Sequence, residues 1–192
     1  MKICVFGASG SELDREYFEA AEELGRLLGR GGHTLVFGAG DRGLLGACAR
    51  GAAAEGAEIL GIAPRFFDEP GVLYQGCTRL ILTETMRERK ALMEDEAEAF
   101  IVMPGGIGTL EEFFEVLTLK QLGCHFKPIA LLNTRAYFDA LHALLTQGAK
   151  ERFLGESCLS FYALCPDPAA ALAHVTAPCA PGPVRTLEDY TK

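Results

Sequence analysis

The densest group of chemically capable residues in this chain follows an apolar segment at residues 99–103, which reads as a buried strand. The loop PGGIGT comes next, and its candidate phosphate ligands are Gly105, Gly106, Gly108 and Thr109. A glycine loop between a strand and a helix exposes backbone N–H groups at the positive end of the helix dipole, which suits a phosphate. Glu111 and Glu112 follow after Leu110. The sequence therefore predicts an anion site beside two carboxylates.

A second charged cluster, TMRERK at residues 85–90, opens another predicted helix. Three cations in the first turn and a half of a helix oppose its dipole, at a cost on the order of a few tenths of a kcal/mol each. An anion, or a carboxylate across a cleft, would offset that cost. We therefore interpret Arg89 and Lys90 as functional residues, whereas Arg87 fits an exposed surface charge equally well.

Both clusters also have a structural interpretation. Thr109-x-x-Glu112 and Thr85-x-x-Glu88 match the capping box, in which a threonine and a glutamate each satisfy a backbone N–H at a helix N-terminus. Glutamates in a first turn also suit the helix dipole. From the residues alone, Glu112 is either a helix cap or a member of a functional site.

The rest of the chain reads as alternating strands and helices that would position these clusters. The expected strands cover residues 2–6, 34–37, 57–62, 79–82, 99–103, 128–132 and 160–165. The expected helices cover residues 14–29, 43–55, 85–98, 110–122, 136–150 and 168–175. Apolar strands that alternate with helices predict a parallel sheet with helices on both faces and ligands at the carboxyl ends of its strands.

We therefore expect an α/β fold with a single doubly wound, Rossmann-like domain over residues 1–178, its parallel sheet flanked by helices. Residues 179–192 are expected to form an irregular C-terminal tail. Residues 63–78 are expected to form a surface excursion or lid, because Pro64, Pro70 and several glycines interrupt any regular pattern there.

The segment GAGDRG at residues 38–43 matches the dinucleotide fingerprint G-x-G-x-x-G. However, it follows the second expected strand rather than the first. The acid about 20 residues further on is Glu58, near the start of a strand, whereas an acid that binds ribose sits at a strand's far end. We interpret these glycines as a tight turn with close helix packing and a share in the ligand pocket, rather than as an NAD or FAD site.

Composition limits the partners. The net charge of −8 opposes nonspecific binding of nucleic acid. No apolar run reaches the roughly 18 residues of a membrane span, and residues 1–6 lack the layout of a signal peptide, so we expect a cytoplasmic protein that does not engage membranes. The seven cysteines and four histidines are scattered. This spacing predicts reduced thiols and no metal site.

Together, the two charged clusters resemble a known family. Met86-x-x-Arg89-Lys90 and the following PGGxGTxxE resemble the LOG ("Lonely Guy") family of cytokinin riboside 5′-monophosphate phosphoribohydrolases, long mislabelled in bacteria as lysine decarboxylases. The resemblance extends from Ile3 to about residue 155 and takes in GAS at 7–9, GAG at 38–40, GLLG at 43–46 and QLGCHFKP at 121–128. The chain departs from the usual Gly, Met and Asp of the family at Ala39, Leu45 and Phe126.

The resemblance implies hydrolysis of the N-glycosidic bond of a nucleoside 5′-monophosphate, either AMP or an N6-prenylated derivative, without a cofactor. It implies Arg89 and Glu112 as the catalytic pair and the glycine loop as the phosphate site. Glu112 could stabilise oxocarbenium-like charge and orient or deprotonate water, while Arg89, which stays charged, would position it or clamp phosphate. The other expected substrate-binding residues are Ser9, Met86, Lys90, Glu111 and Thr118.

Two other classes of protein are alternatives to the phosphoribohydrolase. The glycine loop also resembles that of molybdenum-cofactor carrier proteins, which hold a phosphorylated pterin without turnover; the Arg89–Glu112 pair favours the enzyme, because a carrier has no need of it. A nucleotide-sensing domain is disfavoured because no effector domain is appended. The family resemblance also implies a homodimer whose sites are shared between subunits. Phe113 and Phe114 are expected in the core rather than at that interface.

Overall fold

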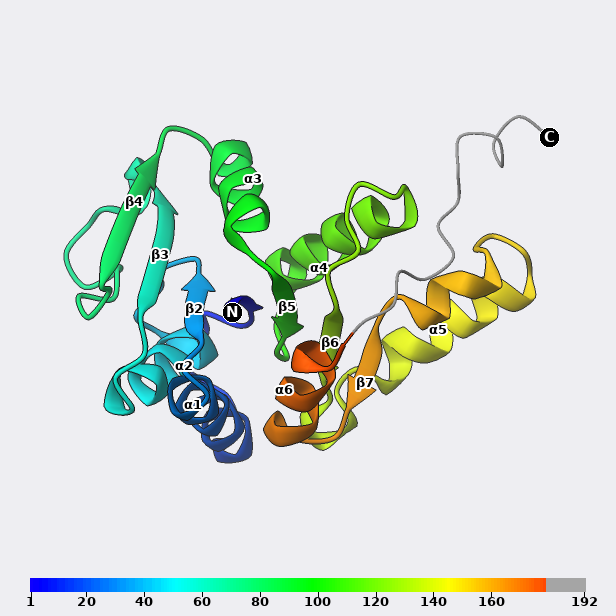
Figure 1. Cartoon of the computed structure of the whole chain (residues 1–192), viewed down its shortest axis with the longest axis horizontal. Helices are drawn as coiled ribbons and strands as arrows, with labels where there is room; N and C mark the ends of the chain where they lie inside the picture. The colour runs from blue at the N-terminus through cyan, green and yellow to red at the C-terminus, as the bar shows by residue number, and fades with distance from the viewer. Residues whose placement is uncertain (179–192) are drawn as a thin grey trace.

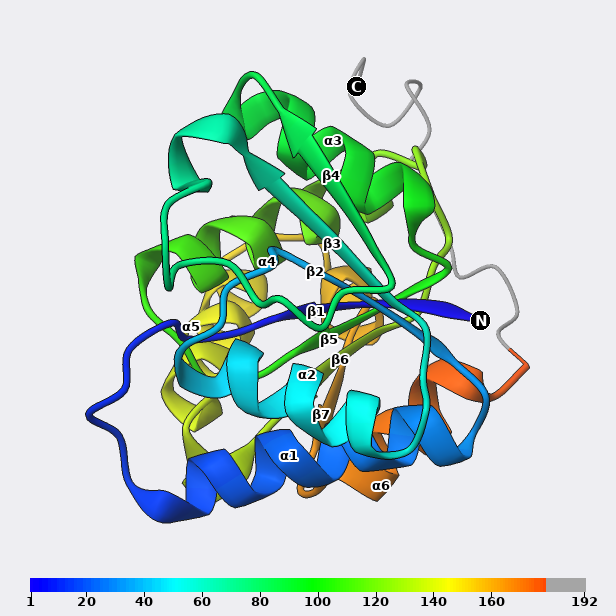
Figure 2. The same ribbon diagram turned by 90° about the vertical axis from the view of Figure 1, so that its left-hand side faces the viewer.

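The computed structural model describes residues 1–178, which form three layers: one parallel sheet between two layers of helices (Figures 1 and 2). The sheet has the order β4-β3-β2-β1-β5-β6-β7. Its strands are β1 (Lys2–Phe6), β2 (Thr34–Phe37), β3 (Ile59–Pro64), β4 (Arg79–Thr83), β5 (Ala99–Val102), β6 (Ile129–Leu132) and β7 (Ala163–Cys165). The strand order reverses between β1 and β5. In a doubly wound sheet, the carboxyl ends beside such a switch point form the ligand site.

Six helices of the described region cover the two faces of the sheet. They are α1 (Arg15–Arg30), α2 (Gly43–Ala54), α3 (Met86–Glu96), α4 (Ile107–Gln121), α5 (Asp139–Lys150) and α6 (Pro168–Thr176). Helices α1, α2 and α6 pack on one face, and α3, α4 and α5 pack on the other (Figure 1). Every strand except β3 is followed by one of these helices, whereas β3 leads to β4 through residues 65–78, which begin with a 3₁₀ turn at Arg65–Phe67.

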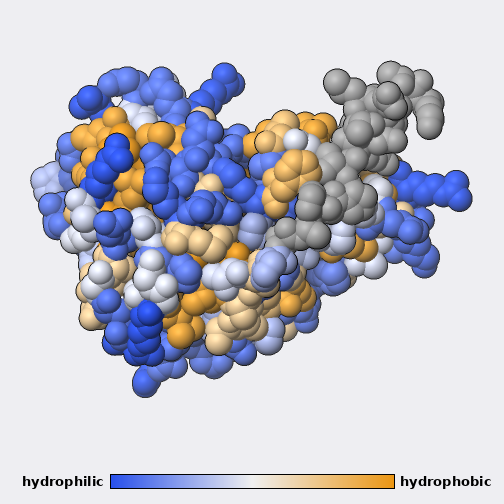
Figure 3. Space-filling view, viewed as in Figure 1, coloured by the Kyte–Doolittle hydropathy of each residue, from blue (hydrophilic) through white to orange (hydrophobic). Residues whose placement is uncertain are grey.

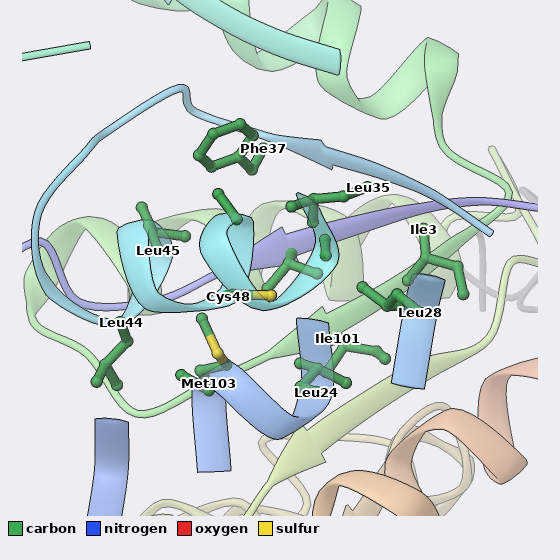
Figure 4. Close-up of a cluster of buried hydrophobic side chains, with 14 of the residues drawn as sticks. Ile3, Leu24, Leu28, Leu35, Phe37, Leu44, Leu45, Cys48, Ile101 and Met103 are labelled. Carbon is green, nitrogen blue, oxygen red and sulfur yellow. The ribbon is translucent and has the colours of Figure 1, made fainter. Parts of the chain in front are cut away.

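Alternation along the strands divides the core into two halves. Ile3 and Val5 of β1 face α1 and α2, whereas Cys4 and Phe6 face α3 and α4. Figure 4 shows the first half, where leucines of α1 and α2 meet the side chains of the sheet. Helices α1 and α2 pack backbone to backbone, since a Cβ at Gly25 would lie 2.0 Å from the Cys48 carbonyl oxygen. The layer of helices α1 and α2 that supports the sheet is therefore closely packed.

The expected α/β fold, with its parallel sheet flanked by helices, is confirmed, and most element boundaries agree with the sequence prediction to within two residues. Three boundaries were wrong. Helix α4 begins at Ile107 rather than residue 110, α5 begins at Asp139 rather than 136, and residues 156–160 form a 3₁₀ turn before a shorter β7. The predicted tail at residues 179–192 lies outside the described residues.

No helix among residues 1–178 is long and apolar enough to span a bilayer. Of the six cysteines in this region, four, Cys4, Cys48, Cys158 and Cys165, are buried. Cys179 lies outside the described residues. Residues 1–178 also contain no group of three or more side chains placed to hold a metal ion.

Candidate functional site

A cavity of about 650 Å³ opens at the carboxyl edge of the sheet, at the switch point between β1 and β5. In Figure 2 the strands run from the N-terminus at the right toward this edge at the left. The lining residues come from five segments: Gly7, Ala8 and Ser9; Gly38, Gly40, Arg42 and Leu45; Phe67, Val72 and Leu73; Met86 and Arg89; and Gly106, Ile107, Gly108, Thr109, Glu111 and Glu112. Residues far apart in sequence thus converge on one cavity.

Arg89 and Glu112 form a buried ion pair in the cavity wall. Arg89 Nη1 donates to Glu112 Oε1 at 3.0 Å, and the two side chains are only 10% and 12% exposed. Arg89 Nε donates to the Ile62 carbonyl oxygen at 3.3 Å, which fixes the guanidinium at the end of β3. Burial raises the pKa of the Glu112 carboxyl above its ordinary value, while the neighbouring guanidinium acts in the opposite direction.

Gly38 makes room for the guanidinium. A Cβ at this position would lie 2.0 Å from Arg89 Nη2, closer than any real contact. The G-x-G-x-x-G segment also supplies the expected turn and close packing, since Gly43 has φ +62° and a Cβ there would lie 2.4 Å from the Ala8 carbonyl oxygen. Glu58 immediately precedes β3, at the opposite edge of the sheet from the cavity. The segment therefore shapes the cavity rather than forming a dinucleotide site.

The N-terminus of α4 contradicts the capping interpretation of Glu112. The N-cap of α4 is Gly106, which has no side chain to cap with, and Thr109 is buried inside the first turn. The Glu112 carboxylate bonds Arg89 instead of reaching back to the cap. The other capping box is confirmed at its threonine, because Glu88 N donates to Thr85 Oγ1 at 3.1 Å.

The backbone of this loop presents donors to the cavity. Gly106, Ile107, Gly108 and Thr109 all line it, and these residues occupy the N-cap and first turn of α4, where N–H groups have no acceptor within the helix. The dipole of α4 adds partial positive charge at the same point. This end of the cavity can hold an anionic oxygen cluster such as a phosphate.

Lys90 joins α3 to α4 rather than facing the cavity. Its ammonium group pairs with Glu111 and with Glu115, the latter at 2.7 Å. Glu94 lies beside this network, and burial together with the Glu115 carboxylate raises its pKa to about 7. Glu111 keeps contact with the cavity lining, so Lys90 positions a cavity residue.

The structure brings together eight of the eleven residues predicted for the site. Ser9, Met86, Arg89, Gly106, Gly108, Thr109, Glu111 and Glu112 all line the cavity. The prediction placed three more residues there, which the cavity lining does not include. Lys90 is tied to Glu111 and Glu115, Gly105 turns its carbonyl toward Tyr137, and Thr118 is exposed further along α4.

Sequence reasoning missed one wall of the cavity. The expectation of an irregular segment at residues 63–78 was only partly right, because Ala63 and Pro64 belong to β3 and Arg65–Phe67 form a 3₁₀ turn. Leu73, moreover, is buried and pairs with Gly40 in an antiparallel bridge. Asp41 N donates to the Val72 carbonyl oxygen at 3.0 Å. The apolar residues of this stretch, Phe67, Val72 and Leu73, were the sequence signal that could have predicted a cavity wall here. The sequence analysis also did not predict Arg42 as a cavity residue. Its position within the glycine-rich segment 38–43 was the only indication of that role.

Two of the three departures from the family pattern lie close to the cavity. Ala39 has φ +59°, a left-handed backbone that favours the family's glycine. Leu45 lines the cavity in place of the usual methionine. Phe126 is 48% exposed and lies outside the lining. The altered residue before Lys127 therefore does not change the cavity surface.

The arrangement of the cavity matches a ligand with three parts. Backbone N–H groups of α4 form an anionic end, and the Arg89–Glu112 pair with Glu111 forms a charged middle. Phe67, Val72 and Met86 add an apolar wall. A carboxylate held beside an anion seat can stabilise positive charge on a group between them.

Comparisons with known proteins identify the family of this chain. A family model described as "Possible lysine decarboxylase" matches residues 45–175. The chain is 38% identical to a cytokinin riboside 5′-monophosphate phosphoribohydrolase of Rhodococcoides fascians, over 92% of this chain and 89% of that protein. It is also 35% identical to LOG2 of Arabidopsis thaliana, which carries the same enzyme name. That match covers 98% of this chain and 83% of LOG2.

Solved structures with this fold include molybdenum cofactor proteins. A molybdenum cofactor binding protein from Rippkaea orientalis superposes with a TM-score of 0.67 at 20% identity, covering 89% of this chain and 92% of that one. The molybdenum cofactor carrier protein of Chlamydomonas reinhardtii gives a TM-score of 0.69 at 20% identity, with coverages of 90% and 93%. At such identities the likeness shows the fold alone.

Proposed function

Because this chain belongs to the LOG family of cytokinin riboside 5′-monophosphate phosphoribohydrolases, we propose that it hydrolyses the N-glycosidic bond of a nucleoside 5′-monophosphate. The products are the free base and ribose 5-phosphate. The observation that carries this proposal is the buried Arg89–Glu112 pair, 3.0 Å apart, beside the backbone donors of α4. Residues 1–178 place no lysine in the cavity lining, which counts against a Schiff-base decarboxylase.

The substrate phosphate would occupy the N-terminus of α4. Its oxygens accept from the backbone N–H groups of Gly106, Gly108 and Thr109 and gain from the helix dipole. The Thr109 side chain packs against Gly105, where an added Cβ would lie 2.2 Å from Thr109 Oγ1. Binding at this seat places the ribose next to Glu111 and Glu112.

Departure of the base builds positive charge on the ribose ring, as in glycoside hydrolysis. The Glu112 carboxylate stabilises this charge and orients the attacking water or takes its proton. Arg89 does not donate a proton, because a guanidinium stays charged; it holds the carboxylate in place and favours its ionised form. Glu111 is suited to accept hydrogen bonds from the ribose hydroxyls.

The apolar wall supports adenine, with or without an apolar arm, as the base. Phe67 and Met86 are 41% and 39% exposed at the cavity, and Ile107 is 85% exposed at its rim. Burying such side chains against a ligand contributes about 25 cal/mol per Å² of apolar area. An isopentenyl group on N6 would use this surface, whereas AMP would leave part of it exposed.

The experiment that tests the function is product analysis with purified protein. We expect free adenine from AMP and free isopentenyladenine from isopentenyladenosine monophosphate, each with one equivalent of ribose 5-phosphate, measured by liquid chromatography and mass spectrometry. The ratio of the two kcat/KM values reports the contribution of the apolar wall. Binding of both nucleotides without any release of base would instead identify a carrier.

We also propose that the protein is a homodimer whose sites are completed by the partner subunit. Exposed apolar side chains lie on the two elements that flank α3. Leu80 lies on β4, Phe114 lies on α4, and Leu122 lies just after the end of α4. Figure 3 shows apolar surface over β3 and β4 and again near the end of α4. Phe113 is fully buried, as expected of a core residue, whereas the expectation that Phe114 also lies in the core was wrong, because it is 37% exposed. Exposed patches of this kind mark association surfaces.

Light scattering coupled to size-exclusion chromatography checks the assembly. A particle of two chains, each of 20.7 kDa, is expected, and Phe114→Glu should shift it toward the single chain. A monomer for the unaltered protein, with full activity, would contradict the shared site.

A further inference from the structure

The peptide between Gly105 and Gly106 is the weak point of the proposed phosphate site. Neither residue has a Cβ to restrict its backbone, so this peptide can rotate more easily than any other at the start of α4. In a trans peptide the C=O and N–H point in opposite directions. Rotation would therefore replace an N–H donor by a carbonyl oxygen, which repels a phosphate.

We propose that Tyr137 fixes the direction of this peptide and is thereby a positioning residue for the phosphate, an inference that rests on the function proposed above. Tyr137 Oη donates to the Gly105 carbonyl oxygen at 2.6 Å. Tyr137 and Gly105 lie outside the cavity lining, whereas Gly106 lies within it. With the carbonyl held on the far side, the Gly106 N–H is directed to the cavity side.

The ring of Tyr137 is itself held in place. It packs edge-on against Tyr17 of α1, with ring centroids 6.3 Å apart. Arg135 lies over the same Tyr17 ring at 5.7 Å and forms an ion pair with Asp14. The neighbouring Phe138 is buried. The hydroxyl of Tyr137 therefore acts from a fixed frame that joins the β6–α5 turn to α1.

The backbone of this turn is strained. Arg135 and Ala136, two consecutive residues with side chains, have φ +54° and +58°, in the region that favours glycine. Asn133 holds the turn on both sides: its N donates to the Cys165 carbonyl oxygen at 2.7 Å, and its Oδ1 accepts from Phe138 N at 2.7 Å. Such strain persists where the surroundings over-determine it, and it concentrates at functional sites. Here it delivers Tyr137 to Gly105.

Tyr137→Phe tests this inference, because it removes the hydroxyl and leaves the ring packing intact. We expect the dissociation constants for AMP and for inorganic phosphate, measured by calorimetry, to rise about tenfold, which corresponds to one hydrogen bond. KM for AMP should rise to a similar extent while kcat stays within about twofold. A purely structural role would lower the thermal midpoint without this split between KM and kcat.

Tyr162→Phe is the matched control. Its hydroxyl hydrogen-bonds His142 Nδ1 at 2.8 Å in the core on the α5 side, away from the cavity. Because Tyr162 is 5% exposed and Tyr137 is 42% exposed, Tyr162→Phe should lower stability at least as much as Tyr137→Phe does, yet leave both dissociation constants unchanged.

The outcomes separate this inference from the proposed function. Unchanged affinities for phosphate and AMP in Tyr137→Phe overturn the positioning role, whatever the activity of the protein. If Tyr137→Phe weakens phosphate binding but the unaltered protein releases no base, the positioning role stands and the proposed function falls. If the unaltered protein binds neither phosphate nor AMP, both are wrong.

Discussion

Replacing Glu112 by glutamine is expected to lower kcat for base release by about 10³-fold, the scale on which a positioned acid or base contributes. Glutamine keeps the shape of the side chain and a hydrogen-bonding oxygen near Arg89, but it can neither accept a proton from water nor balance charge on the ribose. Single-turnover measurement of adenine release from AMP checks the rate. Calorimetry should show AMP binding within a few-fold of the unaltered protein, because the phosphate seat on α4 does not use Glu112.

Glu22→Gln provides the matched control for this substitution. Glu22 also pairs with an arginine, Arg26, at 2.5 Å, but on the exposed surface of α1 away from the cavity. An exposed pair of this kind contributes about 0 to 1 kcal/mol, so the rate should not change. If Glu112→Gln retained a rate within tenfold of the unaltered protein, Glu112 would have no catalytic role and the proposed mechanism would be wrong.

Replacing Arg89 by methionine is expected to shift the acid limb of the pH–rate profile to higher pH and to lower kcat/KM at pH 7 by on the order of 10²-fold. Burial already raises the pKa of Glu112, and Arg89 is the main influence that opposes it. Without the guanidinium the pKa rises further. The ionised carboxylate is the active form, so activity falls as pH decreases through this pKa, and a higher pKa moves that fall upward. Initial rates measured between pH 5 and pH 9 check this.

Gly38→Ala displaces the same guanidinium without removing its charge. Because the new Cβ would lie 2.0 Å from Arg89 Nη2, the arginine must leave its place between Ile62 and Glu112. We expect a loss of kcat/KM that approaches that of Arg89→Met. Gly10→Ala, where an added Cβ meets open space, is the control. Full activity in Gly38→Ala would show that the position of Arg89 is not critical.

The convergence of Arg89 and Glu112 could be predicted from sequence because both follow strands of one parallel sheet. Their separation of 23 residues says nothing by itself about contact. The carboxyl ends of parallel strands share one edge, so both clusters were expected at that edge, although β3, β2 and β1 lie between β4 and β5 in the sheet. The strands themselves were predictable, since buried parallel strands read as apolar runs bounded by glycine, as for residues 2–6 and 34–37.

Other features depended on contacts that no local pattern records. Helix α4 starts three residues before the predicted residue 110, because glycines precede its first apolar repeat, at Leu110, and the predicted capping box at Thr109 was wrong for the same reason. The sequence predicts a surface excursion at Leu73, because the burial of this side chain depends on pairing with Gly40, which is distant in sequence. Tyr137 lacked any signal, because a lone tyrosine after a strand does not reveal which carbonyl it will bond.

The left-handed turn at Arg135 and Ala136 sets a limit on how this protein can gain stability. Each such residue with a side chain costs roughly 1 to 2 kcal/mol, against a net stability of about 5 to 15 kcal/mol for a typical domain. A change that relaxed the turn would make the fold more resistant to heat, yet it would release the tyrosine that the turn presents to the phosphate loop. Selection for thermal resistance and selection for substrate affinity therefore oppose each other at these two positions.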